Sequence, residues 1–124
     1  MRALLLALAV LSLTFPALAE TRVALVIGNG SYKSKPLKNP RSDAGLMART
    51  LANLSFDVMT LMDASDGDMR QAIAEFGRRI AEPGTVALFY YAGHGVQARG
   101  ENYLMPVGVE ARGLQDVSQR GVAL

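Results

Sequence analysis

The chain contains the uninterrupted apolar run VALVI at residues 23–27, followed at once by the turn-forming residues GNG at 28–30. Strands that are buried on both faces of a parallel sheet read as continuous aliphatic runs rather than as an alternation of apolar and polar residues. We therefore expect a first strand over residues 23–27 that is buried on both faces.

Two amphipathic helices are expected downstream of this strand. Asn39 can cap the first, with Pro40 at its first position, because apolar residues then recur at helical spacing as far as Leu54. Ser65 can cap the second, which begins with carboxylates that the helix dipole favours and which Pro83-Gly84 should stop.

Residues 56–62 and 86–91 predict a second and a third strand, the latter apolar throughout. This order of strands and helices predicts right-handed crossovers and a parallel α/β sheet that is covered on both faces. Two short runs, 96–98 and 102–105, flank Gly100 and suggest a small hairpin, and beyond residue 108 the pattern fades. A sheet of three strands leaves an edge uncovered, so we expect further strands in the complete fold.

The N-terminal residues have the three parts of a secretory signal peptide: a positive charge at Arg2, an apolar core over 3–11, and a small-x-small site at residues 17–19. We expect cleavage after Ala19, a secreted or periplasmic location, and no membrane contact afterwards. The alternative, a core helix of a cytosolic protein, fits Pro16 and Glu20 less well. The two predicted regions are thus 1–19 and 20–124.

Composition excludes several classes of function. The 124 residues contain no cysteine, and the net charge falls from +2 to about +1 once Arg2 is removed. The cations between residues 22 and 49 lack aromatic interleaving, so nucleic-acid binding is not expected. Lys33 stands where a dinucleotide fingerprint needs its third glycine, and no phosphate-binding Gly-Lys-Ser/Thr string is present.

Two loops should meet where the strands end, which is where open α/β sheets bind ligands: residues 28–32 and residues 91–95. The second holds His94, the one histidine of the chain, between two glycines at the end of a strand that we expect to be central. Imidazole can take a proton from a thiol and return it to a leaving amine. Gly95 can offer a backbone N–H to the oxyanion that forms, although a plain turn glycine is the alternative.

Several strings of this chain resemble bacterial caspase-like and metacaspase-like cysteine peptidases: RVALVIGN at 22–29, LKNP at 37–40, FYYAGHG at 89–95 and NYL at 102–104. The resemblance implies a three-layer α/β/α sandwich with a mostly parallel sheet, His94 as catalytic base and Gly95 in the oxyanion hole. It also implies that Asp43 lines a pocket selecting arginine or lysine on a peptide or protein substrate. Favouring the helix N-terminus is an equally good explanation of Asp43.

The family's cysteine follows a fourth strand, about 50 residues after the histidine in caspases. Only about 30 residues follow His94, so we expect a partial peptidase domain, truncated before the cysteine-bearing strand and inactive as it stands. The alternative is a caspase-homologous module without catalysis that serves protein association.

No cofactor or metal site is predicted, because one histidine with scattered carboxylates lacks ligand spacing. Calcium dependence stays open, since some metacaspase-type relatives respond to that ion. A solvated strand-to-helix turn is the better explanation of the acidic residues that would permit it. They are Asp57, Asp63, Asp66 and Asp68.

Overall fold

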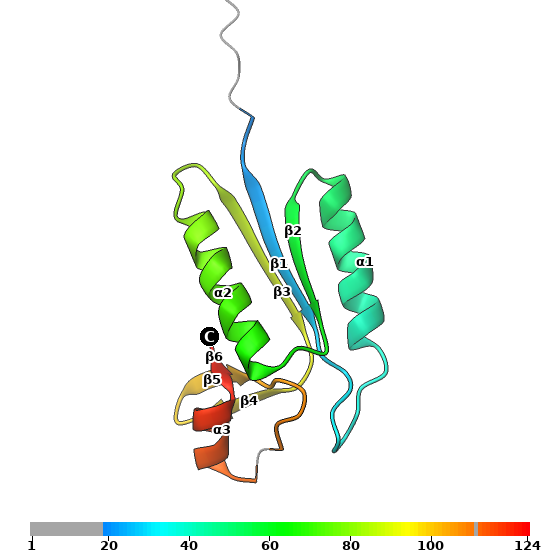
Figure 1. Cartoon of the computed structure of the whole chain (residues 1–124), viewed down its shortest axis with the longest axis vertical. Helices are drawn as coiled ribbons and strands as arrows, with labels where there is room; N and C mark the ends of the chain where they lie inside the picture. Colours follow the sequence, from blue (N-terminus) through cyan, green and yellow to red (C-terminus); the bar gives the residue numbers. More distant parts are fainter. Residues whose placement is uncertain (1–18, 111) are drawn as a thin grey trace, which may run out of the picture.

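A computed structural model describes residues 19–110 and 112–124, so the predicted signal peptide lies outside the described residues except for Ala19. Three parallel strands form the main sheet in the order β2-β1-β3 (Figure 1). The predicted order of strands and helices is confirmed. Its elements are β1 (Arg22–Gly28), α1 (Pro40–Asn53), β2 (Asp57–Met62), α2 (Asp66–Ile80) and β3 (Val86–Ala92).

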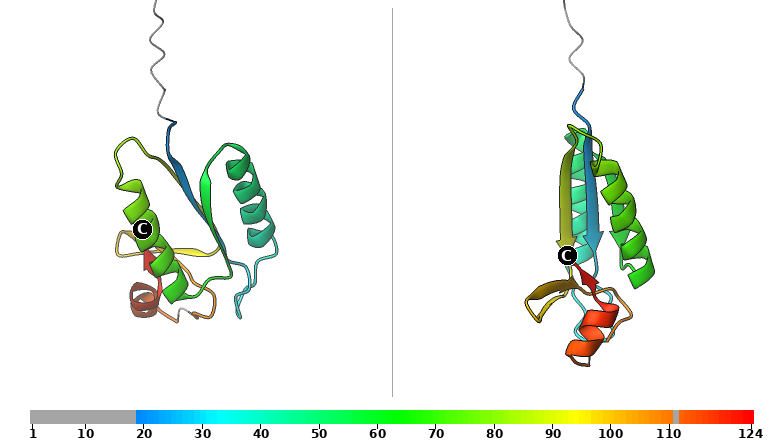
Figure 2. Two further views of the ribbon diagram at one scale, coloured as in Figure 1. Left: turned by 45° about the horizontal axis from the view of Figure 1, so that its top comes forward. Right: turned by 90° about the vertical axis from the view of Figure 1, so that its left-hand side faces the viewer.

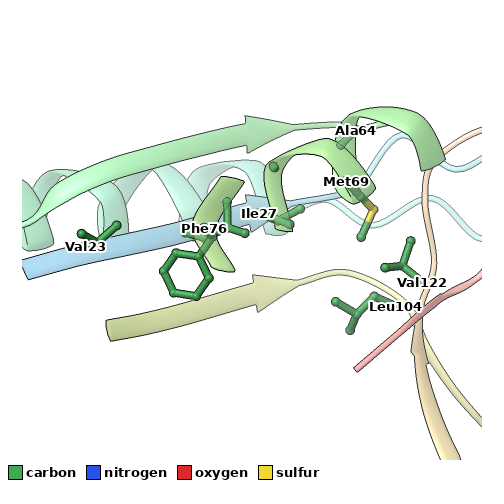
Figure 3. Packing of buried hydrophobic residues seen from close by; sticks show 9 residues of the cluster. Val23, Ile27, Ala64, Met69, Phe76, Leu104 and Val122 are labelled. Carbon is green, nitrogen blue, oxygen red and sulfur yellow. The ribbon is translucent and has the colours of Figure 1, made fainter. Parts of the chain in front are cut away.

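The central strand β1 is buried on both faces, as expected, and its residues point alternately to two cores. Leu25 and Ile27 pack with Met69 and other residues of α2 (Figure 3), whereas Val26 packs with Leu51 and other residues of α1. The helices therefore cover opposite faces, and the predicted three-layer α/β/α arrangement is confirmed (Figure 2). Full burial of a side chain such as Leu25 stabilises the fold by about 1.5–3 kcal/mol.

The prediction that the third strand is central was wrong for the sheet in the described part of the chain. The connection through α2 crosses over β1, so β3 pairs with the free side of β1 and forms an edge. Its residues are consequently less buried than those of β1, and Val86 is 40% exposed.

The two helix starts differ. The Ser65 side chain accepts a hydrogen bond from Asp68 N, as predicted for a cap. Asn39 occupies the cap position of α1 but its side chain makes no capping bond, because its backbone is already helical. Its carbonyl instead accepts from the Ser42 hydroxyl and from Asp43 N, so that part of the prediction was wrong.

A second, antiparallel sheet lies beyond the carboxyl ends of the main strands (Figures 1 and 2). The predicted hairpin is confirmed, and its turn places Arg99 and Gly100 at positive φ, 54° and 83°. Two side chains of this second sheet, Leu104 and Val122, join the core on the α2 side near Met69 (Figure 3). The elements of this region are β4 (Gly95–Ala98), β5 (Glu101–Leu104), α3 (Leu114–Arg120) and β6 (Val122–Ala123).

Among the residues that the structure describes, no helix has both the length and the apolar character needed to cross a membrane.

Candidate functional site

The two loops that sequence reasoning brought together do meet at the carboxyl ends of β1 and β3. Asn29 N, directly after β1, donates to Ala92 O at the end of β3 (2.8 Å). His94 follows two residues later, between β3 and β4, and is half-buried. Its ring lies against that of Tyr32 from the first loop, with centroids 4.4 Å apart and planes tilted by 49°.

The His94 ring is oriented by a main-chain carbonyl. Its Nε2 lies 2.7 Å from Lys35 O. Because a carbonyl oxygen only accepts, Nε2 must carry the hydrogen, and in the neutral ring Nδ1 is then the nitrogen with a free lone pair. Lys35 adopts a positive φ of 53°, which costs energy for a residue other than glycine and aims its carbonyl.

The glycines beside His94 have different reasons for being glycine. A Cβ atom on Gly93 would lie 2.5 Å from the Tyr91 hydroxyl and 2.8 Å from that of Tyr32, so a side chain would displace both. A Cβ on Gly95 would meet Tyr103 O at 3.7 Å, an ordinary contact. Position 93 therefore requires glycine because the two tyrosine hydroxyls approach its Cα closely, and not because of a sharp turn. Position 95 has room for a side chain, so steric exclusion does not account for Gly95.

The Gly95 amide points away from the neighbouring strand. Met105 N donates to His94 O, so this bond joins the two residues that come directly before Gly95 and directly after Leu104, the first register pair of β4 and β5. Hydrogen-bonded and non-hydrogen-bonded pairs alternate in antiparallel sheets, so the next pair, Gly95 and Leu104, is of the second kind.

A cavity of about 520 Å³ opens beside His94. It carries charges of both signs, since Lys35, Glu110 and Arg112 reach it. Its size and its mixture of polar and apolar walls suit a peptide side chain or a short peptide segment. The residues that line it are Tyr32, Ser34, Lys35, His94, Gly95, Val96, Met105, Val109, Glu110 and Arg112.

Asn29 is a fully buried polar side chain of the site, and the sequence alone predicted no role for it. Its Oδ1 accepts from Ala64 N (2.9 Å), and its Nδ2 donates to Met105 O (3.3 Å) and lies 3.5 Å from Met69 Sδ. The amide thereby ties the end of β1 to the segment after β2 and to the loop after β5. An asparagine directly after a buried strand was the available signal.

Asp63, which sequence reasoning considered only for calcium, anchors the first loop. Its Oδ1 accepts from Gly30 N (2.9 Å) and Ser31 N (3.0 Å), and its Oδ2 accepts from the Ser31 hydroxyl (2.9 Å). Arg41 lies 3.4 Å away. Partial burial acts to raise the pKa of Asp63, but these donors and the cation outweigh it and hold the pKa below its usual value.

We expect Asp63→Asn to lower the free energy of unfolding at pH 7 by about 1–3 kcal/mol, because charge-assisted bonds are exchanged for neutral ones. Asparagine tolerates the positive φ of 49° found here, so the backbone is not the cause. A depressed carboxyl pKa contributes stability above the unfolded-state pKa, and this is lost as the pH falls through the folded-state pKa.

The check is urea unfolding of both proteins across an acid-to-neutral pH series. The stability difference should shrink as the pH falls below the ordinary carboxyl range. A difference that is constant over the whole series would show that the charge on Asp63 has no part in it.

Asp43 lies in the first turn of α1, exposed, and does not line the cavity beside His94. The start of α1 packs closely against the end of β1: a Cβ atom on Gly28 would lie only 2.5 Å from Pro40 O. Asp43 and His94 therefore belong to the same end of the sheet but not to one cavity. A role of Asp43 in substrate selection stays a prediction.

Of the four aspartates considered for calcium, three are engaged by arginines. Arg79 pairs with Asp57 (2.7 Å), Arg70 with Asp66 (2.5 Å) and Arg41 with Asp63. In residues 19–110 and 112–124, no group of three or more histidine, cysteine or acidic side chains is placed to hold a metal ion.

Comparison with known proteins agrees with this architecture. The family model described as "Caspase domain" matches residues 21–119. The chain is 40% identical over 91 residues to human "Mucosa-associated lymphoid tissue lymphoma translocation protein 1", and 40% identical over 91 residues to its mouse homolog. Each match covers 73% of this chain and 11% of the relative, so the chain spans about a tenth of those proteins.

Both of these relatives are mammalian, and the narrower likeness to bacterial and metacaspase-type members stays a prediction. The caspase-domain match extends from the start of β1 through most of α3 and includes His94. The chain belongs to the caspase-domain family.

Proposed function

We propose that this chain supplies the base-bearing part of a cysteine endopeptidase site, with His94 as the general base. The observation that carries the proposal is the bond between His94 Nε2 and Lys35 O, which leaves Nδ1 with the lone pair that a base needs. A cavity large enough for substrate lies beside that ring.

The proposed reaction follows the ordinary course of thiol acyl transfer. A cysteine thiol gives its proton to His94 Nδ1, and the thiolate attacks the scissile carbonyl carbon. The negative charge moves to the carbonyl oxygen, where the Gly95 N–H would stabilise it; one such donor is worth about 3 kcal/mol. As the C–N bond breaks, His94 returns the proton to the leaving amine, and water later hydrolyses the thioester.

The thiol has to come from residues other than these 124, because the chain contains no cysteine. The exposed edge of β3, next to the loop that carries His94, supports the prediction that a further strand bearing the thiol pairs there. Export directed by residues 1–19, to a secreted or periplasmic location, remains part of the proposal.

The absence of cysteine also favours a second candidate from another class, a caspase-homologous module that associates with proteins without cleaving them. An assay of the complete gene product against a library of fluorogenic peptides distinguishes the peptidase from the non-catalytic module. Turnover that a thiol alkylating agent abolishes would support the peptidase. Its absence, in a folded protein, would support the module.

Selection for basic side chains is proposed to depend on Asp43. A carboxylate attracts arginine or lysine, so Asp43→Ala should lower the kcat/KM ratio of basic over neutral peptides by about tenfold, the effect of roughly 1.4 kcal/mol. Asp68→Ala, which removes an exposed carboxylate from the first turn of α2, is the matched control. An unchanged preference in Asp43→Ala would remove Asp43 from substrate selection.

A further inference from the structure

Two tyrosine hydroxyls bind the main chain of His94, one at its N–H and the other at its carbonyl oxygen. His94 N donates to the hydroxyl of Tyr32 (3.0 Å), and the hydroxyl of Tyr91 donates to His94 O (2.7 Å). Tyr32 comes from the loop after β1 and Tyr91 from the end of β3, 59 positions apart in the sequence, and their hydroxyl oxygens are 3.2 Å from each other.

Both hydroxyls are also anchored at a common third point. The Tyr32 hydroxyl donates to Met105 O (2.7 Å), and the Tyr91 hydroxyl lies 3.2 Å from the same oxygen. A consistent assignment of hydrogens follows: Tyr32 gives its single proton to Met105 and accepts from His94 N, while Tyr91 gives its proton to His94 O. This assignment needs both phenols to be neutral.

The surroundings keep that network neutral and tight. Tyr32 is 7% exposed. Burial, together with the hydrogen bond to Tyr32, raises the pKa of Tyr91 above its ordinary value. Gly93 leaves the space in which the two hydroxyls meet, since any Cβ there would lie within 2.8 Å of both.

We propose that Tyr32 and Tyr91 are positioning residues that fix the backbone of His94, so that its ring keeps the bond to Lys35 O. The hydroxyls constrain the peptide groups on both sides of the His94 Cα, which sets the direction of the Cα–Cβ bond and hence of the ring. Tyr32 adds a second constraint, because its ring lies against the imidazole. The catalytic meaning of this clamp rests on the proposed function, whereas its geometry does not.

The first test needs no enzymatic activity. His94 is the one histidine of the chain, so [¹⁵N]histidine labelling yields a single imidazole spectrum. At pH 8, where free imidazole is neutral, long-range ¹H–¹⁵N correlations distinguish the Nε2–H from the Nδ1–H tautomer. The wild-type chain should show a dominant Nε2–H form.

Tyr32→Phe and Tyr91→Phe each remove a hydroxyl and keep the aromatic ring. Either should lower the ratio of the Nε2–H to the Nδ1–H form by about fivefold, the effect of losing one typical hydrogen bond. Tyr90→Phe is the matched control, because Tyr90 lies on the same strand but packs toward α1. It should leave the ratio unchanged, and the amide spectrum of each variant shows whether it is folded.

The second test uses the complete, cysteine-bearing protein. Tyr32→Phe and Tyr91→Phe should each lower kcat by about tenfold with KM changed less than about twofold, because a misplaced base slows the chemical step. Unaltered tautomer ratios in both folded variants would overturn the clamp. Altered ratios together with a wild-type protein that cleaves no peptide would retain the clamp and overturn the peptidase.

Discussion

Replacing His94 with alanine in the proposed cysteine peptidase is expected to lower kcat/KM for a peptide substrate by about 100- to 10,000-fold. General acid–base catalysis by a positioned side chain contributes factors of this size. Two proton transfers depend on the same imidazole, one from the thiol and one to the leaving amine, and no second histidine in this chain can replace it. The measurement is steady-state hydrolysis of a fluorogenic peptide.

Gln97→Ala serves as the control for this variant, because Gln97 is an exposed residue of β4 just after the loop. It should retain kcat/KM within about twofold. His94→Ala should also retain its fold, since the ring is only half-buried. Normal turnover by a folded His94→Ala protein would remove His94 from the mechanism.

Asn29→Ala is expected to lower the free energy of unfolding by about 2–4 kcal/mol. The substitution removes the acceptor for Ala64 N and a donor to Met105 O at a site with no exposure to water. A buried polar group that loses its partner costs about 1–3 kcal/mol, and the small cavity left by the side chain adds to this. Met105 O keeps the Tyr32 hydroxyl as a donor, so Ala64 N is the group left unsatisfied.

Urea unfolding monitored by circular dichroism measures this loss. Asn53→Ala, at the exposed end of α1, is the matched control and should change stability by less than about 0.5 kcal/mol. A loss below about 1 kcal/mol for Asn29→Ala would mean that water or a relaxed backbone satisfies Ala64 N. The Asn29 amide would then not be what ties the three segments together.

The main sheet could be predicted because local patterns determine it. A short aliphatic run that is rich in β-branched residues and ends at turn-forming residues favours a strand buried on both faces, and β1 places successive side chains in the α2-side and α1-side cores. The Ser65 cap and the hairpin turn at Gly100 were likewise predictable, because both depend on neighbouring residues.

The C-terminal part of the fold was not predictable in this way. Helix α3 has seven residues and β6 has two, too few for a periodicity to emerge. Helix α3 is held by contacts with β4, and β6 by contacts with β5 and α2, and these elements are distant in sequence. The edge position of β3 is also a matter of topology, since a strand's own residues do not determine which side of β1 it joins.

The site shows the same division. His94 and its loop were found because a histidine between two glycines is unusual at a strand end. The residues that support it were not, because Asp63, Asn29 and Tyr32 act through bonds to main-chain groups of segments far away in the sequence. No spacing rule marks such a contact before the fold is known.

The hydrogen bond to Lys35 O holds one nitrogen of the His94 ring and leaves the other without a partner in the described structure. The ring nitrogen is bonded to a main-chain oxygen rather than to a carboxylate, so orientation is obtained without a neighbouring negative charge. Lys35 can serve in this way because its loop is tied down at Gly30 and Ser31 by Asp63. The loop is thus part of the site although none of its side chains needs to react.

The pairing of His94 with a thiol is tested most directly by the alkylation rate of the nucleophilic cysteine in the complete protein, measured with iodoacetamide as a function of pH. Thiolate, not thiol, reacts, and a neighbouring imidazolium stabilises it. Wild-type protein should be alkylated at pH 6–7 at least about tenfold faster than the folded His94→Ala variant, with the two rates converging above the usual thiol pKa of about 8.5. Equal rates for the two proteins at pH 6–7 would contradict the account.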